Sequence, residues 1–139
     1  MKKILVGVDG SPESRRAAEQ AAELARSLDA QMLVAYVVSL PVPLGPEPAE
    51  LRNWEVAERK QARALLDELV EKYESRGIAI ETVMPSGAPA ETLAEMATGD
   101  AVQLVAIGHR GRGAFVRALL GSVADRLVQI SPKPVLVAR

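Results

Sequence analysis

Four of the ten glycines of this chain cluster near its C-terminal end, at Gly108, Gly111, Gly113 and Gly121, and Ser122 follows the last of them. Glycine lets the backbone take positive φ and lets its amides approach a ligand closely. Ser122 also begins a segment with helical periodicity, and a helix N-terminus presents unpaired N–H groups to an anion. The spacing Gly-x2-Gly-x9-Gly-Ser therefore predicts a phosphate-binding loop.

The charge around this loop supports the same interpretation. Residues 101–124 contain no Asp or Glu, although the whole chain has a net charge of −1. The loop carries the basic side chains His109, Arg110, Arg112 and Arg117. The alternative is a plain flexible turn, with Ser122 capping the helix, Asp125 completing an S-x-x-D box and the arginines in solvent. Phosphate binding is favoured because the loop follows a strand, lacks acidic residues and ends at a serine. We expect the His109 side chain to face solvent.

Several other functions are excluded by what the sequence lacks. There is no Gly-x4-Gly-Lys-[Ser/Thr] and no Gly-x-Gly-x-x-Gly, the fingerprints of P-loop and dinucleotide sites. The chain has no cysteine and one histidine, which excludes thiolate nucleophiles, iron–sulfur clusters and cysteine zinc sites. The near-neutral charge gives no field that attracts nucleic acid. The apolar run 4–8 is too short for a signal peptide or a membrane span, so we expect a cytoplasmic protein without a membrane partner.

The elements that must position the loop alternate between apolar runs and amphipathic segments. Strands are predicted at 3–8, 31–38, 78–84, 102–107 and 134–138, and helices at 12–28, 49–76, 89–98 and 122–130. The proline-rich stretch 39–48 is expected to be a surface connection. This alternation predicts an α/β fold in one domain, 1–139, with a five-stranded, mostly parallel sheet and helices on both faces. We expect the strand order 3-2-1-4-5, with ligands at the carboxyl ends of the strands.

The segment 49–76 has the longest amphipathic pattern. Gly77 is expected to end the helix. The side chains predicted to face the core are Leu51, Trp54, Leu65, Leu66, Leu69 and Tyr73.

Three motifs spread over the chain resemble the universal stress protein family. They are Val6-Gly7-Val8-Asp9-Gly10-Ser11, the glycine loop ending at Gly121-Ser122, and Ser131-Pro132-Lys133-Pro134-Val135-Leu136-Val137. The similarity covers the whole chain and implies a Rossmann-like fold of the adenine nucleotide alpha hydrolase type. In that family the intact glycine spacing marks the ATP-binding branch.

The resemblance also implies roles for individual residues. The ribose and phosphates of ATP, ADP or AMP would be surrounded by Gly108, Gly111, Gly121, Ser122 and Val123. Val8 and Val37 would contact adenine, Ile107 would end the strand beside them, and Asp9 could help hold Mg²⁺ or Mn²⁺ bound to the phosphates. The turn Gly87-Ala88-Pro89 resembles a family turn near the pocket, and the family often has a histidine where this chain has Tyr36. The types of Asp9-Gly10-Ser11-Pro12 also fit a helix-entry turn that needs no ligand.

These residues predict a stress-response regulator or sensor that holds ATP and hydrolyses it slowly at most, because no positioned general base or acidic pair is present. The resemblance implies a homodimer formed through the C-terminal strand, Pro134–Ala138. The alternative from another class is a dimeric interaction module of the same fold that binds no nucleotide. A phosphoacceptor receiver domain is disfavoured because the third predicted strand ends Met84-Pro85-Ser86, without an Asp that could be phosphorylated. A flavin-binding site is disfavoured because few aromatic residues are present to stack on the flavin.

Overall fold

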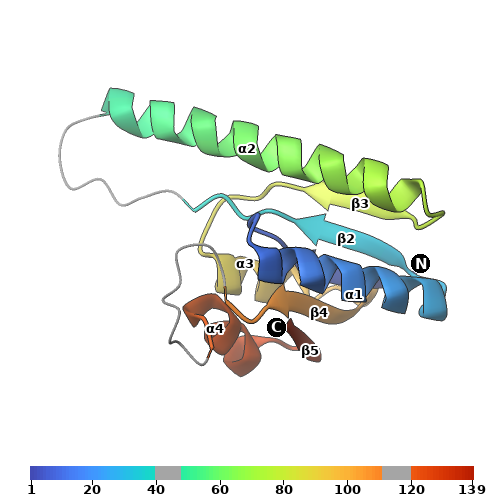
Figure 1. Ribbon diagram of the computed structural model, residues 1–139. Coiled ribbons are helices and arrows are strands. Elements are labelled where there is room, and N and C mark those ends of the chain that lie inside the picture. The colour runs from blue at the N-terminus through green and yellow to red at the C-terminus, as the bar shows by residue number, and fades with distance from the viewer. Residues whose placement is uncertain (40–47, 111–119) are drawn as a thin grey trace.

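The computed structural model describes residues 1–39, 48–110 and 120–139, and its strands form one sheet (Figure 1). The strands are β1 (Lys3–Gly7), β2 (Gln31–Ala35), β3 (Ile80–Val83), β4 (Val102–Gly108) and β5 (Val135–Ala138). The helices are α1 (Pro12–Leu28), α2 (Pro48–Glu74), α3 (Pro89–Met96) and α4 (Ser122–Ile130). All neighbouring strands pair in parallel, in the order β3-β2-β1-β4-β5. The predicted fold class and strand order are confirmed.

The two faces of the sheet are covered by different helix pairs. Alternating residues of a strand point to opposite faces, so Ile4 and Val6 pack with α1 and α2, whereas Leu5 packs with α3 and α4. The buried face of α1 is made of small side chains, which allow the helix to approach the sheet closely. These are Ser14, Ala17, Ala18, Ala21, Ala22 and Ala25.

The order of the strands places a switch point between β1 and β4. From β1 the chain moves outward through β2 to β3, then returns to add β4 on the other side of β1. The loops that leave the carboxyl ends of β1 and β4 therefore lead to opposite faces and leave a crevice between them. This crevice lies where the sequence predicts it.

The second strand is shorter than its apolar run suggests. We expected a strand over 31–38, but β2 ends at Ala35 and residue 38 pairs with Ser86 only through an isolated bridge. The reason is that the neighbouring β1 ends at Gly7 and turns into α1. Residues 36–38 remain attached on the β3 side, through Tyr36 N to Val83 O at 3.1 Å and Val38 N to Pro85 O at 2.8 Å.

The long helix extends past the strands that it covers (Figure 1). With 27 residues α2 is about 40 Å long at ~1.5 Å per residue, more than twice the length of β2 or β3. The prediction that Trp54 faces the core is wrong, because its side chain is 39% exposed. The predicted core residues nearer the carboxyl end, from Leu65 to Tyr73, are buried. Within the described ranges, no helix is both long and apolar enough to cross a bilayer.

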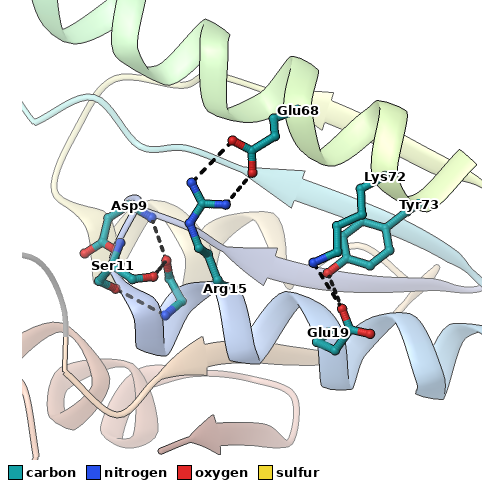
Figure 2. Close-up of polar contacts among 8 residues, drawn as sticks. Asp9, Ser11, Arg15, Glu19, Glu68, Lys72 and Tyr73 are labelled. Carbon is teal, nitrogen blue, oxygen red and sulfur yellow. Dashed lines mark hydrogen bonds and ion pairs between the residues drawn. The ribbon is translucent and has the colours of Figure 1, made fainter.

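Charged side chains join α1 to α2 along the solvent edge of their contact (Figure 2). Arg15 pairs with Glu68 through both terminal guanidinium nitrogens. Glu19 accepts hydrogen bonds from Arg76 and from the Tyr73 hydroxyl, the latter at 3.1 Å. The hydrogen bond from Arg15 lowers the pKa of Glu68, and the one from Arg76 lowers the pKa of Glu19.

The lowered pKa of Glu68 predicts a pH-dependent contribution to stability. A carboxylate whose pKa is lower in the folded state stabilises the fold above its unfolded pKa and loses this effect as the pH falls through the folded value. Because the Glu68 side chain is 55% exposed, we expect Glu68→Gln to cost only about 0.2–1 kcal/mol at pH 7 and nothing well below pH ~4. Urea denaturation at pH 7 and pH 3 measures this difference. The exposed Glu71 of the same helix, as Glu71→Gln, is the control; an equal loss in both variants would contradict the prediction.

Candidate functional site

A cavity opens at the carboxyl ends of β1, β2 and β4, between the starts of α1, α3 and α4. Most of its lining is apolar, and the polar and charged groups belong to Asp9, Ser11, Ser14 and Arg110. The complete lining is Gly7, Val8, Asp9, Ser11, Ser14, Ala35, Val37, Pro89, Leu93, Ile107, Gly108, Arg110, Val123 and Ala124. A largely apolar pocket with few polar groups is the usual form of a small-molecule site.

Most of the site residues expected from the sequence come together here. Val8, Asp9, Val37, Ile107, Gly108 and Val123 all line the cavity. Gly121 and Ser122 lie beside it at the start of α4 without forming its wall. Gly111, together with Gly113, Arg112 and Arg117, lies outside the described residues.

The floor of the cavity contains residues that sequence reasoning missed. Leu93 of α3 and two small strand residues, Gly7 and Ala35, line one side of the cavity, which we call its floor. A Cβ at position 7 would lie 2.7 Å from the Leu93 Cδ1 atom, so only glycine fits without a shift of that side chain. A glycine inside an otherwise apolar strand marks such a close approach, and this signal could have identified the floor.

Two of the four loop glycines, Gly108 and Gly121, lie among the described residues, and neither has the positive φ that the sequence predicts for the loop. We expected them to provide positive φ, but of the described glycines only Gly10, Gly77 and Gly87 do so. At Gly108 a Cβ would lie 2.8 Å from the Ser14 amide nitrogen, so the end of β4 packs directly on the backbone of α1. Gly121 has φ −65° and ψ 155°, which any residue can adopt. Close backbone approach, rather than unusual dihedral angles, explains the glycine at position 108.

The start of α4 leaves backbone donors beside the cavity. Its N-cap is Gly121, not Ser122, and no side chain caps it, so the S-x-x-D box considered above does not form. The first helical hydrogen bond runs from Asp125 N to Gly121 O at 2.9 Å, which leaves the preceding N–H groups of the first turn pointing out of the helix end. Gly121 N also donates to His109 O at 2.8 Å, so the two ends of the loop are held together.

The Asp9 turn is a hydrogen-bonded entry into α1 (Figure 2). The Asp9 carboxylate accepts from Ser11 N at 2.9 Å, and Ser11 Oγ accepts from Ser14 N at 3.2 Å. Ser14 Oγ in turn accepts from Asp9 N at 3.3 Å and donates to Ser11 O at 2.9 Å. This turn accounts for the residue types Asp9 and Ser11 without a ligand, while Asp9 also lines the cavity.

Three helix N-termini converge on the cavity. The Ser11 side chain caps α1. The N-cap residues of α3 and α4 are Ala88 and Gly121, and neither offers a side-chain acceptor. Helix N-termini carry partial positive charge and favour anions within the first turn. In the part of the chain that the structure describes, no three His, Cys, Asp or Glu residues are grouped to hold a metal ion. The arrangement suits a ligand with an apolar, flat end and an anionic end.

Comparisons with known proteins point to one family. The sequence model of the universal stress protein family matches residues 1–139. A universal stress protein of Methanocaldococcus jannaschii is 34% identical over an alignment 141 positions long, which covers 99% of this chain and 82% of that protein. The solved structure of universal stress protein UspA from Lactobacillus plantarum aligns with a TM-score of 0.92 at 24% identity, over 99% of this chain and 97% of that one. A universal stress protein crystallised in complex with cAMP aligns with a TM-score of 0.72 at 27% identity, over 99% and 96% of the two chains.

The contact at Gly108 predicts a stability defect that is independent of any ligand. A methyl group at this position must push the first turn of α1 away from β4, because it meets backbone atoms that cannot rotate aside. We expect Gly108→Ala to destabilise the fold by about 1–3 kcal/mol, measured by thermal or urea denaturation without nucleotide. At Gly99 an added Cβ would make only an ordinary contact at 3.7 Å, so Gly99→Ala is the matched control. Equal stability of the two variants would show that β4 and α1 separate without cost.

Proposed function

Because the chain belongs to the universal stress protein family, we propose that residues 1–139 form a nucleotide-binding domain that holds ATP. One observation carries the proposal: an apolar pocket between strand ends adjoins helix N-termini whose caps offer no side-chain acceptor. A purine ring and a polyphosphate are the two ends of a single ligand that matches both parts. The related protein crystallised with cAMP, at 27% identity, supports an adenine nucleotide as the ligand class.

In the proposed complex the adenine lies against Val8 and Val37, with Ile107 beside them, where the lining is apolar. The phosphates lie toward Gly108 and the first turn of α4, including Ser122 and Val123. Backbone N–H groups there replace part of the hydration that the anion loses on binding. The Arg110 side chain, which also lines the cavity, adds positive charge at this end.

A divalent ion would enter together with the phosphates rather than on a protein site of its own. Asp9 is the carboxylate of the cavity, and one of its oxygens already accepts a hydrogen bond from Ser11 N. One carboxylate plus phosphate oxygens is the usual way in which Mg²⁺ is held beside a nucleotide, where it neutralises phosphate charge. The proposed role is a regulator or sensor that retains ATP.

The proposal predicts binding of Mg-ATP in isothermal titration calorimetry, and a selective loss in Ser122→Asp. A carboxylate at the exposed first position of α4 stabilises the helix but repels the phosphates, so affinity should fall about tenfold or more while the melting temperature is unchanged or higher. The neutral isostere Ser122→Asn lacks the repelling charge and should lose much less affinity than Ser122→Asp.

Two results would reject nucleotide binding. They are the absence of heat with Mg-ATP and the absence of any adenine nucleotide released when the purified protein is denatured and chromatographed. Together they would favour the ligand-free interaction module.

We further propose that the protein is a homodimer formed through β5. This strand lies at an edge of the sheet, and Val135, Leu136 and Val137 are only half-buried. An apolar edge strand with free backbone groups is normally covered. Val105 N donates to Pro134 O, and His109 N donates to Ala138 O. The backbone groups of the even-numbered residues of β5 therefore face β4. By alternation, the N–H groups of residues 135 and 137 point away from the sheet.

Proline at position 137 tests this dimer. Val137→Pro removes an outward N–H and leaves the bonds to β4 in place, so the chain should fold and run as a monomer in size-exclusion chromatography with light scattering. Val137→Thr, which keeps the N–H, should remain dimeric. A folded Val137→Pro variant that is still dimeric would place the interface elsewhere.

A further inference from the structure

A buried hydrogen bond joins α2 to the residues that follow β2. The Tyr36 hydroxyl donates to Glu58 Oε1 at 2.7 Å, and the two residues are 2% and 9% exposed. A carboxylate and a phenol held this far from water need hydrogen-bond partners, because burying either group without one costs free energy, and this bond meets part of that need. Neither residue lines the proposed nucleotide cavity.

Tyr36 is nevertheless the direct neighbour of a cavity residue. Successive side chains of an extended segment point to opposite faces. Tyr36 and Val38 belong to the core beneath α1 and α2, whereas Val37 packs against the core beneath α3 and α4 and lines the cavity. Any movement that withdraws Tyr36 from α2 therefore moves Val37 as well.

The backbone of this segment is held along one side. In the described ranges, its hydrogen bonds come from the β3 side, including Gly87 N to Val38 O at 3.0 Å, and Val8 N to Ala35 O is the last bond between the β1 and β2 chains. An extended segment paired along one edge can twist about that edge. A side-chain anchor on the opposite face of the sheet prevents this rotation.

The amino-terminal half of α2 supplies that anchor because the helix extends past the strands. Beside Glu58, Arg59 donates to Ser86 Oγ at 2.8 Å, in the segment that leads to Pro89 at the cavity wall. Two consecutive α2 residues thus contact two segments that border the cavity. The part of α2 that extends past the strands thus holds the segments that border the cavity. A helix as short as the strands could not reach them.

We propose that Glu58, acting through Tyr36, is a positioning residue that holds Val37 against the adenine ring. The inference rests on the proposed nucleotide function and goes further by assigning base recognition to a hydrogen bond on the far side of the sheet. It predicts that loss of this bond weakens binding of the base while contacts to the phosphates are unaffected.

The test compares two tyrosines that each donate to a glutamate. Tyr36→Phe removes the bond to Glu58, and Tyr73→Phe removes the bond from the buried Tyr73 to Glu19 near the other end of α2. Affinities for ATP, adenosine and inorganic tripolyphosphate are measured at a temperature where both variants are folded. Tyr36→Phe should weaken ATP and adenosine by the same factor, about tenfold, and tripolyphosphate by less than about twofold, whereas Tyr73→Phe should change none of them.

Two substitutions of Glu58 complete the test if the phenylalanine variant does not fold. Glu58→Gln keeps an acceptor for the hydroxyl and should retain affinity, whereas Glu58→Asp withdraws the acceptor by one methylene and should reproduce the selective loss. The inference is overturned if ATP and tripolyphosphate weaken equally, or if Tyr36→Phe behaves like Tyr73→Phe. A wild-type chain that binds no adenine nucleotide would reject the proposed function and, with it, this role.

Discussion

The structure depends on the close approach of α1 to the end of β4. At Gly108 the strand touches the backbone of Glu13 and Ser14, with no room for a side chain. This contact fixes the Asp9 turn against the start of the loop that follows β4. Since α3 packs in a similar way on Gly7 through Leu93, the helix starts gather around one point at the carboxyl edge of the sheet. The cavity is the space that these close contacts leave between them.

Electrostatics acts locally in this molecule. The net charge is −1, and the ion pairs between α1 and α2 lie on the opposite face from α3 and α4. Among the described residues at the cavity, positive charge comes from Arg110 and from the backbone N–H groups at the helix starts. Partial charges fixed in helix ends need no reorganisation when a ligand arrives, whereas exposed side-chain pairs are weakened by solvent and salt.

Successive side chains of the segment that follows β2 reach opposite faces of the sheet. Val37 borders the cavity on one face, and Tyr36 contacts Glu58 of α2 on the other. The long helix therefore contacts the segment that carries Val37, although no described α2 residue lines the cavity. Its exposed Trp54 follows from the same geometry, because a helix long enough to reach past β2 carries some side chains beyond the core.

The sequence alone determined the order of elements and the parallel sheet, because apolar periodicity and helix starts are local properties of the chain. It also placed Val8, Asp9, Val37, Ile107, Gly108 and Val123 at one crevice. Only the tertiary structure decided why Gly108 is glycine, that Gly121 and not Ser122 caps α4, that Leu93 forms the floor, and that Trp54 is exposed. Each of these depends on which distant backbone or side chain lies within a few ångströms, and periodicity along one chain does not carry that information.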